Sequence, residues 1–165
     1  DIAQCLVGSE MCIRDRYQYT FLDEYSRFRY LEAFEEHNTY TSAVFLRHVV
    51  EKFPYAIECI QTDNGAEFTK RLLPKGNDTP TLFENTLQEL GIRHKLIRPY
   101  TPRHNGKVEL SHRKDNEEFY ASHRFYSFED FKKQLAIRER AYNNFPMRPL
   151  NWQSPKQVLS SFPNV

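Results

Sequence analysis

The order of hydrophobic patterns along the chain is the feature that most constrains its fold. An aromatic-rich run predicts a strand at residues 17–22, and a second run at residues 28–34 predicts its antiparallel partner after a turn. Short apolar runs at residues 56–61 and 92–97 predict two more strands, each preceded by a helical pattern. Further helical patterns begin near residues 106, 128 and 155. The sequence therefore predicts a mixed α/β domain with helices flanking one sheet.

Helix-start signals support these boundaries. Asn38 with Thr39, and Ser127, are residues of the kind that cap helices, and Thr81 with Glu84 has the spacing of a capping box. Ser154 followed by Pro155 predicts the start of a short last helix. Two finer expectations are a hydrophobic staple between Tyr126 and Phe131, and a core face on the first helix made of Ala43, Leu46, Val49, Val50 and Phe53.

Composition limits the class of protein. A length of 165 residues suits a single domain with its own core, and the 39% apolar and 27% charged residues exclude a disordered chain. No apolar run approaches the length of a membrane span, so we expect no membrane partner. The cysteines Cys5, Cys12 and Cys59 form no CxxC pair, which argues against a disulfide framework and favours a reducing cytoplasm.

Charge is unevenly distributed, although the net charge is only +1. Between Arg93 and Lys114 the chain carries seven Lys and Arg residues and a single acid, Glu109. Such a local basic run is a candidate surface for the phosphates of a nucleic acid. A solvated helix face without a ligand is the alternative, and charge alone does not decide between them.

Two acids stand at positions where carboxylates can do chemistry. Asp63 follows a predicted buried strand and begins a tight Asn-Gly turn, at the edge of the sheet where α/β folds place their ligands. Glu109 lies in the first turns of a helix that begins at Gly106. Taken singly, Asp63 is more simply explained as a turn residue and Glu109 as a salt-bridge partner of nearby bases.

The residues around these acids resemble a known family. The segment Gln61-Thr-Asp-Asn-Gly65, followed by Tyr100-Thr-Pro-Arg-His-Asn-Gly-Lys-Val-Glu109, is similar to the central signature of bacterial insertion-sequence transposases and retroviral integrases. The early segment Leu22-Asp23-Glu24-Tyr25-Ser26-Arg27 and the later Tyr142-Asn-Asn, Arg148-Pro149 and Ser154-Pro155 are similar as well. The resemblance covers residues 17–165 and implies a ribonuclease H-like mixed sheet flanked by helices.

The resemblance also implies an activity. These families use an Asp-Asp-Glu triad, in which Asp63 would be the second acid and Glu109 the third. The triad would bind two Mg²⁺ or Mn²⁺ ions, which activate the attacking oxygen and stabilise the leaving oxygen as DNA is cut and then joined to a target. The expected partners are transposon-end and target DNA, with self-association on DNA, in the bacterial cytoplasm. The residues expected to contact DNA phosphates are Arg103, His104, Lys107, Arg113 and Lys114.

The first acid of the triad has no clear counterpart. It would precede residue 17, where residues 6–16 show neither helical nor strand periodicity and read like a translated sequencing-library adapter, since ATG TGT ATA AGA GAC encodes Met11-Cys-Ile-Arg-Asp15. A natural surface loop is the alternative. Asp1 has a plausible distance from the second strand, Asp15 belongs to the suspect segment, and Asp23 matches a turn in the family.

We therefore expect residues 1–16 to be a non-native or remnant segment. Residues 17–165 would then be an integrase-type catalytic core that lacks most of its first strand. Such a chain would be poorly stable and could be catalytically inactive while still binding DNA. A ribonuclease H-like nuclease without strand transfer is a third interpretation, which the stretch that ends at Glu109 disfavours.

Overall fold

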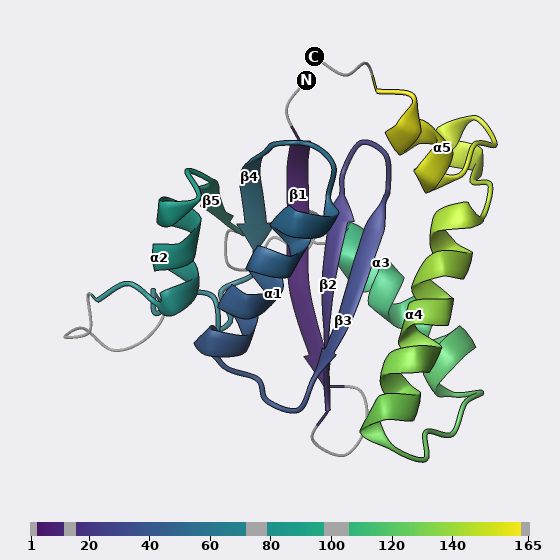
Figure 1. Cartoon of the computed structure of the whole chain (residues 1–165), viewed down its shortest axis with the longest axis horizontal. Helices are drawn as coiled ribbons and strands as arrows, with labels where there is room; N and C mark the ends of the chain where they lie inside the picture. The colour runs from purple at the N-terminus through teal and green to yellow at the C-terminus, as the bar shows by residue number, and fades with distance from the viewer. Residues whose placement is uncertain (1–2, 12–15, 72–78, 98–105, 163–165) are drawn as a thin grey trace.

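The protein is built on one five-stranded sheet in the order β3-β2-β1-β4-β5 (Figure 1). The computed structural model describes residues 3–11, 16–71, 79–97 and 106–162, and only the backbone of residues 3–4, 9–11 and 106–109. The strands are β1 (Ala3–Met11), β2 (Tyr17–Asp23), β3 (Arg29–Phe34), β4 (Ile57–Thr62) and β5 (Arg93–Leu96). β1, β2 and β3 pair antiparallel, whereas β4 pairs parallel to β1 and to β5. The predicted mixed sheet is therefore confirmed.

Helices cover both faces of this sheet. Figure 1 shows α1 crossing one face and α3 lying behind the other. The helices are α1 (Thr39–Lys52), α2 (Leu82–Glu89), α3 (Gly106–Asp115), α4 (Phe128–Asn144) and α5 (Pro155–Ser160), and a π-helical turn, Asn116–Tyr120, continues α3. None of the helices in the described ranges has the length and apolar character needed to cross a bilayer.

Local signals fix most helix starts as the sequence predicts. Asn38 caps α1 by accepting from the backbone N–H groups of Tyr40 and Thr41, and Ser127 caps α4 by accepting from Asp130. Thr81 and Ser154 form capping boxes at α2 and α5. The predicted staple is wrong, because Tyr126 is 91% exposed and so does not pack on Phe131. Its backbone N–H donates to Asp130 instead.

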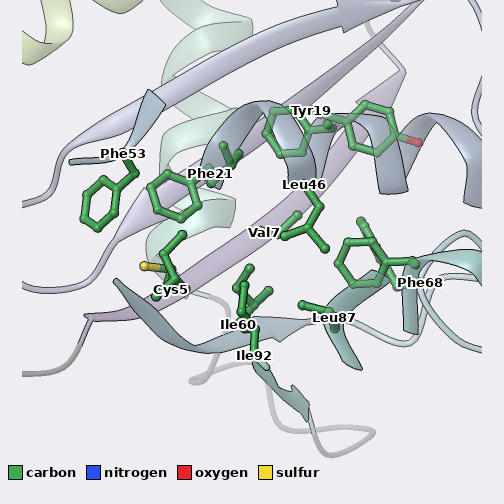
Figure 2. Close-up of a cluster of buried hydrophobic side chains, with 14 of the residues drawn as sticks. Cys5, Val7, Tyr19, Phe21, Leu46, Phe53, Ile60, Phe68, Leu87 and Ile92 are labelled. Atoms are coloured by element: carbon green, nitrogen blue, oxygen red, sulfur yellow. The ribbon is translucent and has the colours of Figure 1, made fainter. Parts of the chain in front are cut away.

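The main core lies between the sheet and α1 (Figure 2). Strand residues of alternate positions, such as Val7, Tyr19 and Ile60, point to this side and are at most 2% exposed. From α1, Leu46, Val49, Ala43 and Phe53 are buried as predicted. Val50 is 36% exposed and does not belong to the core, whereas Phe45, which the predicted face omits, is fully buried.

The N-terminal segment is part of the sheet. We expected a core without most of its first strand, but residues Ala3–Met11 form β1 at the centre, between β2 and β4. Its Cys5, Leu6 and Val7 are almost completely buried. A central strand needs apolar residues and backbone pairing on both sides, and this segment supplies both. Its adapter origin stays a prediction, which the structure does not test.

Candidate active site

Asp63 lies in a rigid turn directly after β4. Its Oδ1 accepts a hydrogen bond from the backbone N–H of Gly65 at 2.9 Å, and the Asn64 side chain donates to the Ile97 carbonyl at 2.8 Å. A Cβ at position 65 would lie 2.5 Å from the carboxylate of Glu67, so any other residue there would displace that carboxylate. These contacts fix the Asp63 carboxylate where the turn leaves the sheet.

The surroundings of Asp63 suit a carboxylate that binds a cation. Burial raises the pKa of Asp63 above its ordinary value, the hydrogen bond from Gly65 lowers it, and the nearby negative charge of Glu67 raises it. Glu67 is 7% exposed, and its Oε1 lies 2.9 Å from His37 Nε2. A positive ion next to Asp63 would relieve both the desolvation and the repulsion.

The register of β1 puts one of its residues level with Asp63. Leu6 pairs with Gln61 in the parallel β1–β4 ladder, so two residues further along, Gly8 is level with Asp63. Leu6 belongs to a small cluster with Leu22, separate from the α1 core, so Gly8 also faces the side of the sheet that α3 covers. Gly8 is buried and pairs with Thr20 of β2. The β1 position beside Asp63 therefore carries no carboxylate.

Helix α3 is attached to this part of the sheet by polar contacts. His112 Nε2 lies 3.2 Å from the hydroxyl of Thr20, the residue that pairs with Gly8. Burial lowers the pKa of His112 to about 4, and the charge of Arg29 adds to the effect, so the imidazole is neutral. The contact thus links α3 to β2, the strand that lies next to β1 and its residue Gly8.

A buried ionic network fixes the C-terminal end of α3. Asp115 is fully buried and accepts hydrogen bonds from Arg29 of β3, from Arg138 Nε at 3.2 Å and from Gln18 Nε2 at 3.3 Å. The Arg29 guanidinium is itself buried, and its centre lies 4.9 Å from the ring centroid of Tyr142. Arg29 and Asp115 are 86 residues apart in sequence, and no local pattern predicts that they meet.

Glu109 lies on α3, one helical turn before His112. Its side chain is outside the described part of the structure. Because His112 contacts Thr20 of β2 and α3 also contacts β1, the helix lies over the face of the sheet towards which Gly8 points, and β1 is the neighbour of β4, after which Asp63 follows. The observed order across this face is α3 over β2 and β1, with β4 next to β1.

The other predicted site residues have varied positions. Arg113 and Lys114 are exposed on α3. Only the backbone of Lys107 is described, and Arg103, His104, Asp1 and Asp15 lie outside the described residues. Asp23 is buried and closes a turn, since its Oδ2 accepts from the backbone N–H of Ser26 at 2.8 Å.

The described side chains contain no group of three or more His, Cys, Asp and Glu residues that could hold a metal ion. His94, one of the three histidines in the basic run, lies 2.8 Å from the Thr62 hydroxyl and is therefore structural.

Solved structures with the same fold include integrases. The catalytic core domain of BIV integrase matches with a TM-score of 0.69 and 16% identity, over 95% of this chain and 93% of that one. A simian T-cell lymphotropic virus intasome, in complex with a PP2A regulatory subunit, matches with a TM-score of 0.71 and 14% identity, over 98% of this chain and 56% of that one. The fold is thus that of a retroviral integrase core, which is ribonuclease H-like.

Sequence profiles give the family. The profile of one integrase core domain matches residues 7–102, and a second integrase core domain profile matches residues 90–155. The first match covers more than half of the chain and begins within the suspect segment. No curated protein matches the sequence. The chain belongs to the integrase core domain family, whose members are polynucleotidyl transferases of DNA integration and transposition that use divalent metal ions.

Proposed function

We propose that this domain cuts and joins DNA strands with a carboxylate site to which Asp63 and Glu109 both contribute. The single observation that supports this assignment is the attachment of α3 through His112 to Thr20, which brings the helix of Glu109 over the strands next to Asp63. The prediction that the two carboxylates are close enough to share an ion rests on the order and spacing of the motifs that contain them. Coordinates that put Glu109 on the opposite face of the sheet would overturn the assignment.

The proposed residues fit a hard divalent cation. Mg²⁺ prefers carboxylate oxygens, and Asp63 is a partly buried carboxylate whose pKa is raised by burial. Two such ions, when bound, would activate the attacking oxygen and stabilise the leaving one. The Gly65 N–H holds Asp63 in one orientation, and the α3 network would do the same for Glu109. Arg103, His104, Lys107, Arg113 and Lys114 would contact phosphates on either side of the reacting bond.

The chain with its present sequence has a second candidate function, as an inactive DNA-binding domain. The observation that favours it is Gly8, which occupies the β1 position level with Asp63 and offers no ligand. Asp1, the other candidate for the first acid, lies outside the described residues. Strand transfer would then require an acid at position 8. Self-association on DNA would not require that acid.

The test compares this chain with its Gly8→Asp variant in the Mg²⁺-dependent joining of a labelled DNA end to a plasmid. We expect no joining by the unchanged chain and joining by Gly8→Asp, which Asp63→Asn or Glu109→Gln added to that variant abolishes. Gly8→Asn is the matched control, with equal volume and no charge. Mg²⁺ should also raise the melting temperature of Gly8→Asp and leave that of Gly8→Asn unchanged. Joining by the unchanged chain would show that another acid completes the site.

A further inference from the structure

A pocket of about 660 Å³ lies between α3, α4 and the turn that precedes α5. Leu110 and Lys114 of α3 form one wall, and Tyr142 and Phe145 of α4 form another. Its volume is in the range of sites that hold one small organic molecule. Leu110 is adjacent to Glu109 in the sequence, so the pocket lies on the flank of the helix that carries the proposed catalytic acid.

The pocket exposes aromatic and apolar surface to solvent. Trp152 is 71% exposed and Phe145 is 66% exposed, and both line the pocket, as does Leu110 at 45%. A planar indole that is neither packed in a core nor covered is a suitable platform for another flat ring. The core of the domain does not require these side chains, because neither Trp152 nor Phe145 belongs to a buried cluster.

The backbone around the pocket adopts an uncommon conformation. In the described ranges the non-glycine residues with positive φ are Arg27, Asn151 and Trp152. Arg27 and Trp152 line the pocket, and Asn151 is next to Trp152. The turn is closed by hydrogen bonds, since the N–H groups of Trp152 and Met147 donate to the carbonyls of Met147 and Gln153, both at 3.0 Å. Such left-handed residues persist where surrounding contacts impose them, and they concentrate at binding sites.

The charge of the pocket is positive. Its lining residues include Arg27, Lys114, Arg138 and Arg148 against one acid, Glu118. Arg138 is engaged by Asp115 at 3.2 Å and Glu118 at 2.7 Å. The other three basic residues therefore give the rim a net positive charge. A ligand that suits this pocket combines an aromatic ring with a negative group.

We propose that this pocket binds an unpaired nucleotide of the DNA strand, with its base against Trp152 and Phe145 and its flanking phosphates near Lys114, Arg27 and Arg148. The proposal rests on the proposed function only in taking DNA as the substrate. Stacking on an exposed aromatic ring beside a basic groove is the usual way in which proteins hold single-stranded nucleic acid. A DNA strand that is splayed open near Glu109 would thus be held on the flank of α3, the helix of Glu109. Holding the strand there would keep the reacting phosphate in position.

The direct test uses the fluorescence of Trp152, the only tryptophan in the chain. The chain is titrated in EDTA with a single-stranded oligonucleotide of about ten nucleotides, a typical site size. The same strand in a duplex, and the same strand with abasic sites, are the comparison ligands. We expect saturable quenching by the single strand, little quenching by the duplex, and roughly 5- to 100-fold weaker binding of the abasic strand.

Variants assign the effect to the pocket. In anisotropy measurements with a labelled single strand, Trp152→Ala should weaken binding roughly 5- to 100-fold, whereas Trp152→Phe should retain most of it because a ring remains. Tyr126→Ala is the matched control, since Tyr126 is an exposed aromatic outside this pocket. Arg148→Ala should weaken binding of the single strand and reduce its salt dependence.

Three results would overturn the proposal. The first is equal quenching by duplex and single strand, or unchanged affinity of Trp152→Ala. The second is quenching by an acidic, aromatic peptide and not by the oligonucleotide, which would assign the pocket to a protein partner. The third is a loss of self-association in Trp152→Ala with DNA affinity intact, which would assign it to a second copy of the chain. EDTA prevents metal-dependent chemistry, so this titration does not depend on joining activity. Stacking by the chain together with no joining by Gly8→Asp would reject the proposed function and leave this proposal standing.

Discussion

The two faces of the sheet are held to their helices in different ways. On the α1 face, aromatic and aliphatic side chains from β1, β2, β4 and α1 form one buried cluster. On the opposite face, the α3 face, the described side chains of α3 contact the sheet through polar groups, with Gln18, Thr20 and Arg29 of the sheet meeting His112 and Asp115 of the helix. Apolar packing on this face joins β3 to α4 and the π-helical turn through Leu31, Ala33, Phe119, Phe131 and Leu135. Burial of apolar surface is non-directional and tolerates small shifts, whereas hydrogen bonds between buried polar groups fix one register.

The difference matches what each face has to do. The α1 face buries the larger apolar cluster. The α3 face carries a helix whose sequence, Gly106–Asp115, is mostly polar and cannot be held by an apolar stripe. Directional contacts therefore keep the helix of Glu109 in one place on the sheet, which suits a site where small displacements reduce the rate. Four predictions test this comparison.

Removal of one member of the polar network should have the largest effect. Arg29→Met leaves the Asp115 carboxylate buried with fewer partners, so we expect the free energy of unfolding to fall by about 3–5 kcal/mol in urea denaturation. Arg47→Met is the control, because the Arg47–Glu89 pair is more than half exposed and should contribute at most about 1 kcal/mol. Equal losses in the two variants would show that the network is not important for stability.

A cavity in the α1 face should lower the free energy of unfolding slightly less, but its effect should extend over the whole sheet. Ile60 is fully buried, and Ile60→Ala should lower the free energy of unfolding by about 2–4 kcal/mol. Ile137→Ala, at a position that is 58% exposed, should change it by less than about 0.5 kcal/mol. Hydrogen exchange distinguishes the faces: Ile60→Ala should raise exchange throughout the sheet, and Arg29→Met mainly in α3. The same exchange pattern in both variants would contradict the comparison.

Low pH should destabilise the protein through protonation of His112 on the α3 face. Its pKa in the folded protein is about 4, below the ordinary 6.5, so the unfolded chain takes up the proton first. Stability is therefore fully present above about pH 6.5 and declines as the pH falls towards 4, by at most about 3 kcal/mol. Melting curves across this window should show the decline, and His112→Gln should flatten it. An unchanged slope in His112→Gln would mean that other groups are responsible.

The smallest expected effect concerns the exposed side of α3. Arg113→Ala should weaken binding to all DNA sequences alike and reduce the slope of log K against log salt by about one unit, as expected for one phosphate contact. Lys107→Ala should behave in the same way. Arg124→Ala, an exposed residue beyond α3, is the control. A loss confined to one DNA sequence would indicate base recognition instead.

Features set by short-range sequence were predictable. The caps at Asn38, Thr81, Ser127 and Ser154 depend on residues within three positions of each other, and all four are confirmed. The staple failed although its spacing is local, because Tyr126 finds no apolar surface to cover and stays in solvent. On α1 the periodicity located the core side, but it included Val50 and omitted Phe45, since the edge of a buried stripe depends on what the helix packs against.

The strand β1 shows the limit of periodicity. Residues Ala3–Met11 lack an alternating pattern, yet they occupy the middle of the sheet, where both sides are covered and alternation is not required. The backbone can pair with β2 and β4 whatever the side chains are. This also explains how a segment of suspected foreign origin is compatible with the fold although it carries glycine at position 8, where the proposed function would need an acid.

The sequence by itself determined the family, the order of the strands and helices after β1 and the turn that holds Asp63, because these depend on residues close together in the chain. Only the tertiary structure decided which strand residue lies beside Asp63 and what holds α3 in place. Gly8 is 55 residues before Asp63, and Arg29 is 86 residues before Asp115. Their proximity depends on strand register and helix packing, for which the chain carries no local signal.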